Sequence, residues 1–355
     1  MKYSALPIFR HFTGDFPEVN VQISSTSRFP MPMPFGWFGI DWSDTLAVGE
    51  SRAVRFFGQD LVLFRSESGK ACVLEAYCPH LGAHLGFGIH ENMDKGGGRI
   101  EGESIACPFH AWKFNGEGEC TDVPYAKNMP PKVQGKKCLK SFEVVETNQM
   151  IYVWYHPEGV APMWEVAVHE EANSPDWAPF DRKEWIVKSH NQEMAENAAD
   201  PAHFRYVHGT ASMPDWEINY DGPVARGLQR AKMTTPRGDV NGEIHTFSKG
   251  PGQGSTRFKG IAETFLLSST VPVDENTVRI LFGFSHPMVN GEPVKGGVNA
   301  AIVKDVCKQF EEEKPIWENK IYRALPVLCD GDGPIAKFRK WYTQFYAGGF
   351  DPKSV

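Results

Sequence analysis

The sequence predicts an α+β protein with two domains, one β-rich and one of mixed strands and helices. Its 355 residues are enough for two separate hydrophobic cores. Short strand-like segments dominate the first part, whereas helical patterns near 190–208 and 300–320 flank several strands in the second part. The breakers in His156-Pro157-Glu158-Gly159 lie between these parts. We therefore expect an irregular lead-in over residues 1–35, a β-rich domain over 36–156 and an α+β domain over 157–355.

The individual strands are bounded by turn residues. Segments 59–65 and 71–75 flank Ser66-Glu67-Ser68-Gly69-Lys70 as in a hairpin, and 149–155 forms the last strand of the first domain. In the second domain, 263–267 and 277–284 are clear strands, with Asp274-Glu275-Asn276 as the turn between them. The long helical pattern at 300–320 is expected to lie against these strands, which gives layers of helix and sheet.

Composition and charge exclude several classes of protein. Hydrophobic residues make up 41% and charged residues 23%, as in ordinary globular chains. A net charge of -7 argues against nucleic acid as the main partner. Seven scattered cysteines favour reduced thiols in a cytoplasm over a disulfide framework, and neither a signal peptide nor a membrane span is visible. The apolar segment 31–38 could touch a membrane that stores substrate, but we expect it to pack on its own domain.

Two short loops offer four metal ligands of two chemical kinds. Cys78 and His80 form a C-x-H pair, and Cys107 and His110 form a C-x2-H pair. Two thiolates and two imidazoles suit a [2Fe-2S] cluster with two cysteines on one iron and two histidines on the other. A structural zinc ion is the alternative, because the same four residues could close a tetrahedron.

The flanking residues CPHLGAHLG and CPFHAWKFNGEGEC resemble those of Rieske proteins. The resemblance implies that Cys78 and Cys107 hold one iron and that His80 and His110 hold the other. Between His80 and Cys107 lie 26 residues, which is about ten more than the family pattern. The excess falls in the glycine-rich stretch 89–98, which we interpret as an inserted surface loop.

A second group of histidines follows the sequence Asp200-Pro201, which predicts a helix start with Asp200 as the N-cap. His203 and His208 are five residues apart, so their rings would diverge by about 140° on an ideal helix. The helix must therefore end or distort near His208 if both are to bind one ion, and Gly209 is well placed to end it. Two imidazoles and a carboxylate form the facial triad of non-haem Fe(II) oxygenases.

The pattern N-x2-D-x2-H-x4-H resembles that of the catalytic (alpha) subunits of Rieske non-haem iron oxygenases. It is complete here in Asn197, Asp200, His203 and His208. The resemblance implies a mononuclear Fe(II), an α+β catalytic domain of the helix-grip, START-like kind, and a homotrimer. It also implies that Asp200 links His203 to a Rieske histidine of a neighbouring subunit.

Helical geometry selects Glu313 as the third ligand among three successive acids. Glu313 lies within about 60° of apolar side chains on its helix, whereas Glu311 and Glu312 lie about 200° and 100° away and read as a solvated charge run. The family usually has Asp at this ligand position, so Asp305 is the alternative.

The segments AHFRYVHG and DGPIAKFRKWYTQFY resemble the oxygenase component of 3-ketosteroid 9α-hydroxylase. This implies a monooxygenase that uses O2 and electrons from NAD(P)H through a separate ferredoxin or flavin-dependent reductase. A steroid-like apolar substrate is expected, in a pocket that Phe265, Leu267, Phe282 and Phe284 could line. Oxidative O- or N-demethylation of a small methylated compound is the alternative reaction, and a non-catalytic electron-transfer or metal-binding protein is the alternative of another class. The loop 250–254 is not G-x-G-x-x-G, so the chain itself shows no flavin or nicotinamide site.

Overall fold

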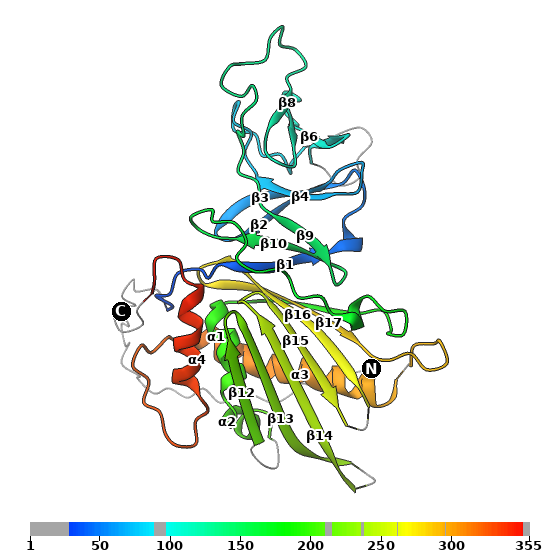
Figure 1. The fold of residues 1–355 in the computed structure, drawn as a ribbon, viewed down its shortest axis with the longest axis vertical. Helices are drawn as coiled ribbons and strands as arrows, with labels where there is room; N and C mark the ends of the chain where they lie inside the picture. The colour runs from blue at the N-terminus through cyan, green and yellow to red at the C-terminus, as the bar shows by residue number, and fades with distance from the viewer. Residues whose placement is uncertain are drawn as a thin grey trace, which may run out of the picture.

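The computed structural model describes residues 28–88, 97–209, 215–235, 238–260, 262–294 and 296–350. Figure 1 shows an elongated molecule in which small sheets lie above one large sheet. Strands β6 and β8 lie at one end, β1 and β10 lie in the middle, and the large sheet with its helices fills the other end.

Three small antiparallel sheets form the first part of the chain. They have the orders β1-β10-β9, β2-β3-β4 and β5-β6-β7-β8. Their strands are β1 (Gly36–Trp42), β2 (Ser51–Phe56), β3 (Gln59–Arg65), β4 (Ala71–Glu75), β5 (Arg99–Glu101), β6 (Ser104–Ala106), β7 (Lys113–Asn115), β8 (Cys120–Asp122), β9 (Val144–Thr147) and β10 (Met150–Tyr155). The hairpin predicted over 59–75 is confirmed, because β3 and β4 have the predicted bounds.

One seven-stranded antiparallel sheet, of order β11-β17-β16-β15-β14-β13-β12, dominates the second part. Its strands are β11 (Asp181–Val187), β12 (Asp215–Asp221), β13 (Val224–Thr235), β14 (Gly238–Lys249), β15 (Gln253–Lys259), β16 (Thr264–Asp274) and β17 (Thr277–Ser285). The helices are α1 (Asn191–Glu196), α2 (Ala202–Tyr206), α3 (Gly297–Asn319) and α4 (Ile335–Tyr342). Helix α3 runs across one face of the sheet (Figure 1), so the predicted α+β layering is confirmed.

Strand β16 contacts the first part of the chain with one face and a cavity with the other. Phe265 and Leu267 pack in a core with Trp37 and Tyr152 of β1 and β10. Leu266 and Ser268 face the opposite way and line a cavity beneath α3. The expectation that Phe265 and Leu267 line the substrate pocket is therefore wrong. Their side chains point to one face of the sheet, and the cavity lies on the opposite face.

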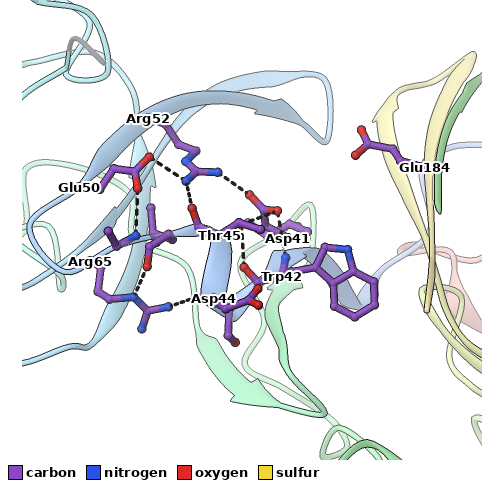
Figure 2. Close-up of polar contacts among 12 residues, drawn as sticks. Asp41, Trp42, Asp44, Thr45, Glu50, Arg52, Arg65 and Glu184 are labelled. Atoms are coloured by element: carbon purple, nitrogen blue, oxygen red, sulfur yellow. Dashed lines mark hydrogen bonds and ion pairs between the residues drawn. The ribbon is translucent and has the colours of Figure 1, made fainter. Parts of the chain in front are cut away.

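Polar contacts stabilise the region around β1, in the middle of the molecule (Figure 1, Figure 2). Figure 2 shows Arg52 between Asp41, Glu50 and the Thr45 carbonyl. Its Nη1 lies 3.0 Å from Asp41 Oδ2 and its Nη2 lies 2.7 Å from Glu50 Oε1. Asp44 accepts two hydrogen bonds, of 2.6 and 3.0 Å, from Arg182 of the large sheet. Polar as well as apolar contacts therefore join the two parts.

The apolar segment 31–38 packs inside the protein, as expected. Met31 is 2% exposed, Phe35 6%, Trp37 3% and Phe38 0%. None of the seven cysteines forms a disulfide. In the described part of the chain, none of the helices is both long and apolar enough to span a membrane. The cytoplasmic location remains a prediction.

Candidate metal centres

The two ligand loops at the tip have the same backbone conformation. In each, the cysteine N–H donates to the carbonyl five residues on: Cys78 to Ala83 at 2.9 Å and Cys107 to Trp112 at 2.7 Å. The N–H of the fourth residue returns to the cysteine carbonyl, and that residue has a positive φ, 75° at Gly82 and 55° at Ala111. Two matching turns thus present two thiols and two imidazoles toward each other.

The thiols are buried and the imidazoles are half-buried. Cys78 is 2% exposed and Cys107 4%. The hydrogen bond between the two thiols, together with burial, raises the pKa of Cys78. The same bond lowers the pKa of Cys107 to about 6, helped by the N–H groups of Phe109 and His110. The two sulfur atoms therefore lie close together, as is required of two cysteines that bind one iron.

The imidazoles form a second pair. The ring centroids of His80 and His110 lie 4.9 Å apart, and Trp112 stacks on His80 at 4.6 Å. Trp112 Nε1 donates to the Tyr125 hydroxyl at 2.8 Å, and this hydrogen bond orients the Trp112 ring that stacks on His80. Zinc would require all four ligand atoms to converge, yet among the described residues they form no group whose ligand atoms all lie within 4.8 Å. Two separate pairs fit a two-iron cluster, not a single ion.

The second centre lies between the helices and the large sheet. Among the described residues, one group of three ligand side chains converges within 4.8 Å, namely His203, His208 and Glu313. Glu313 Oε1 lies 3.2 Å from His203 Nε2 and 2.9 Å from His208 Nε2. Asn197 donates to the same oxygen at 2.9 Å, and Glu313 is only 7% exposed. A buried carboxylate between two imidazoles is the donor set of a 2-His-1-carboxylate iron site.

The predicted distortion of the histidine helix is present. Helix α2 ends at Tyr206, and Gly209 has a φ of 68°, so His208 leaves the helical path and turns back to meet His203. The Asp200 carboxylate accepts from the Ala202 N–H at 3.0 Å, as a capping residue does. Its other oxygen lies 3.9 Å from His203 Nδ1, which is buried and has no hydrogen-bond partner.

The sequence interpretation of Glu312 was wrong. Glu312 Oε2 lies 3.1 Å from His208 Nδ1, and Glu312 Oε1 lies 3.2 Å from Lys308 Nζ. The side chain therefore contacts His208 and is not part of a charge run that only water surrounds. The contacts of Glu312 with His208 and Lys308 lower its pKa. Glu311 instead accepts from Trp185 Nε1 at 2.7 Å. Asp305, the alternative third ligand, is exposed and bonds to Gln309, away from the histidines.

A cavity of about 340 Å³ opens beside the second centre. The three ligand residues and Asn197 border it, together with side chains of α3 and of the large sheet. Phe282 lines it as predicted, but Phe284 does not appear in its wall. Such a volume suits a small organic molecule.

Comparison with known proteins agrees with both centres. The family described as Rieske [2Fe-2S] domain matches residues 36–143, and the family described as 3-Ketosteroid 9alpha-hydroxylase C-terminal domain matches residues 153–346. This chain belongs to the Rieske oxygenases with a C-terminal domain of that type. It is an oxidoreductase, and its cofactors are a Rieske [2Fe-2S] cluster and a mononuclear non-haem iron.

Two relatives span most of this Rieske oxygenase. "Cholesterol 7-desaturase nvd" of Xenopus laevis is 32% identical over 90% of this chain and 73% of its own length. The "3-ketosteroid-9-alpha-monooxygenase, oxygenase component" of Rhodococcus rhodochrous is 30% identical over 94% of this chain and 86% of its own length.

Solved structures share the fold. "Pseudomonas putida CBB5 NdmA with caffeine" superposes with a TM-score of 0.69 at 19% identity, covering 86% of this chain and 89% of that one. Dicamba monooxygenase bound to dicamba superposes with a TM-score of 0.66 at 16% identity, covering 87% and 96%.

Proposed function

We propose that this protein is the terminal oxygenase of a multicomponent monooxygenase that hydroxylates a steroid-like apolar substrate. The observation that carries this proposal is the buried group His203, His208 and Glu313 at the wall of a cavity, in a chain that also carries a cluster site. Both relatives described above act on steroids or sterols by name, which supports the substrate class.

We assign each cofactor to the residues that fit it. Cys78 and Cys107 bind one iron of the cluster, and His80 and His110 bind the other. His203, His208 and Glu313 bind the mononuclear Fe(II). The metals supply electron transfer and O2 chemistry when bound, which no side chain can provide.

The overall reaction takes one C–H bond, O2, two electrons and two protons to one C–OH group and water. A separate ferredoxin or flavin-dependent reductase supplies the electrons from NAD(P)H. The protein holds Glu313 through Asn197 and holds His208 through Glu312.

We further propose a homotrimer in which electrons cross between subunits. Figure 1 shows the tip strands β6 and β8 and the helix α2 at opposite ends of one chain. An electron that stayed within one chain would have to travel that length. The Asp200 side chain is 38% exposed, and one of its oxygens lies 3.9 Å from His203 Nδ1; both observations support a contact of Asp200 with an imidazole of a neighbouring subunit.

Desaturation of a sterol is the second candidate reaction, because the relative from Xenopus laevis is named a desaturase. It removes two hydrogen atoms from the substrate and inserts no oxygen. Neither of the two relatives described above is named for the demethylation of a small methylated compound.

The decisive experiment combines metal analysis with product analysis. We expect three irons and two acid-labile sulfides per chain, and a steroid product that gains one oxygen atom from ¹⁸O2 when a ferredoxin and reductase are supplied. A product lighter by two hydrogen atoms would establish desaturation. Two irons per chain without O2 uptake would contradict the oxygenase proposal, and turnover only of methylated aromatics would contradict the substrate class.

A further inference from the structure

The last turn of α3, the helix that carries Glu313, is capped by an arginine from a distant segment. The guanidinium group of Arg28 donates to the carbonyl groups of Trp317 at 2.9 Å, of Lys320 at 3.2 Å, and of Glu318. Carbonyls at the end of a helix lack intrahelical partners, so each of them needs a donor from elsewhere. The planar fork of an arginine can serve several of them at once.

Two features of α3 make this external cap necessary. Pro315 lies inside the helix, so the Glu311 carbonyl receives no N–H group from the residue four positions on. The last turn of α3 also contains no basic residue, although a cation at the carboxyl end of a helix is stabilising. We therefore expect residues 316–319 to fray if the Arg28 guanidinium is removed.

The segment around Arg28 also binds the chain that leads into α1. Arg28 Nη2 donates to the Lys188 carbonyl at 2.9 Å, and the Pro32 carbonyl lies 3.2 Å from His190 Nε2, at the start of α1. The segment 28–32 is anchored by two side chains that are each 2% exposed, namely Phe29 and Met31. It therefore joins the end of α3 to the start of α1 from a buried position.

Three polar contacts connect the α1 region with the end of α3. They pair the Lys188 N–H with Glu318 Oε1 at 3.2 Å, Glu193 Oε2 with Lys320 Nζ at 2.7 Å, and Asn197 Nδ2 with Glu313 Oε1 at 2.9 Å. The first two lie beside the carbonyls that Arg28 binds, and the third lies at the metal site. A shift of the last turn of α3 against α1 would therefore change the contact between Asn197 and Glu313.

Trp317 provides a second connection between the cap and the site. It lies four residues after Glu313, which is about one helical turn, and both residues line the cavity. Its side chain is 6% exposed and packs on Phe310 with a ring-centroid distance of 5.3 Å. Because Arg28 binds the Trp317 carbonyl, it fixes the helical turn that begins at Glu313.

We propose that Arg28 is a positioning residue for the mononuclear iron site. It holds the end of α3 against the start of α1, and this spacing sets how Asn197 presents Glu313 Oε1 to the two histidines. Arg28 touches neither the metal nor the substrate. The inference rests on the proposed function, because it concerns the site to which we assign the Fe(II).

Hydrogen exchange of the iron-loaded full chain, followed by mass spectrometry, tests the cap in the wild type. Helix ends normally fray and exchange quickly. We expect amides 317–320 to exchange within about tenfold of the rate in the middle of α3, and a larger difference would overturn the inference. In Arg28→Met, which keeps an apolar stem but no donor, exchange of these amides is expected to be at least about tenfold faster than in the wild type.

The EPR spectrum of the nitric oxide adduct of the mononuclear Fe(II) reports its ligand geometry, and the oxidised cluster contributes no signal. Arg28→Met is expected to change the splitting of this signal and to lower the Fe(II) affinity about threefold to tenfold, less than the loss of a side chain that contacts a ligand directly. Arg28→Lys is expected to restore both in part, because an ammonium group donates hydrogen bonds but cannot span several carbonyls as a guanidinium does. Loss of overall stability alone would leave the spectrum of the folded protein unchanged.

Arg65→Met is the matched control, because Arg65 also donates to three carbonyls, those of Ser43, Leu46 and Gly69, in the first part of the chain. It is expected to lower the thermal midpoint but to keep the spectrum and the Fe(II) affinity. An unchanged spectrum with an affinity within about twofold in Arg28→Met, or equal changes in Arg65→Met, would overturn the inference and leave the proposed oxygenase intact. A wild type that binds no mononuclear iron would overturn the proposed function as well. If Arg28→Met does not fold, Arg28→Lys and the exchange pattern of the wild type decide the question.

Discussion

Removal of the Glu312 side chain is expected to weaken iron binding without touching a ligand. Glu312 accepts from His208 Nδ1 at 3.1 Å, which orients the ring so that Nε2 points at Glu313. Partners of this kind usually contribute about 10–100-fold to metal affinity. Since the Glu312 side chain is 32% exposed, water can partly replace it, and we expect about tenfold, or about 1.4 kcal/mol, for Glu312→Ala.

Competition with a chelator would measure the affinity for Fe(II), and the EPR signal of the reduced cluster would serve as an internal standard. Glu312→Gln keeps an acceptor oxygen and is expected to fall between Glu312→Ala and the wild type. Glu311→Ala is the control on the same helix, because Glu311 bonds to Trp185 and not to a histidine. An affinity of Glu312→Ala within twofold of the wild type, or an equal loss in Glu311→Ala, would refute the positioning role.

Three further perturbations test the packing and the buried polar groups around the site. The buried ion pair of Arg339 and Glu196, with hydrogen bonds of 2.6 and 2.8 Å, joins α4 to α1. Arg339→Met is expected to lower the free energy of unfolding, measured with denaturant, by about 3–5 kcal/mol, because it leaves the Glu196 carboxylate buried without a partner. Arg339→Met/Glu196→Leu is expected to lower it clearly less. Gly252→Ala is expected to lower the thermal midpoint because its Cβ would lie 2.3 Å from a ring atom of β1, whereas Gly331→Ala, with its nearest atom at 3.7 Å, is expected to change little. Burial lowers the pKa of His190 to about 4, so the unfolded chain takes up this proton first, and acidification from pH 7.5 to 5 costs about 2 kcal/mol. His190→Asn, which replaces the capping Nδ1 by a side-chain oxygen, is expected to flatten that part of the curve of thermal midpoint against pH, and an unchanged slope would contradict this assignment.

Features encoded locally were predictable from the sequence. The hairpin of β3 and β4 follows from two short apolar runs, 61–64 and 71–74, on either side of a glycine turn, and its bounds were correct. The end of the histidine helix near His208 followed from the angle between two side chains, which a regular helix cannot reconcile with one ion. The choice of Glu313 over its neighbours followed in the same way, because burial on a helix repeats with its period.

Features that depend on packing were not predictable. A strand that is apolar on both faces gives no signal for which face meets the substrate, and Phe265 and Leu267 of β16 turned out to face β1 and β10. Glu312 has the exposure pattern of a solvated residue with an i,i+4 lysine partner, and its contact with His208 depends on the return of His208 across the site. Residues 89–96, which include His90 and most of the expected inserted loop, lie outside the described part of the chain.

The difference between the predictable and the unpredictable features has one cause, namely whether local geometry or the pairing of strands fixes the direction of a side chain. The proposed metal ligands lie in short loops or on a helix with a regular period, whose local geometry fixes their direction, so their residue types indicate the chemistry. The cavity is lined by residues from six strands and four α-helices, and whether a strand's side chain points toward the cavity is decided by sheet register. Ser, Thr and Gly on a strand look unremarkable in the sequence. Only after β13–β16 pair in register do Gly227 and Gly254 come to lie beside Thr246 and Ser268.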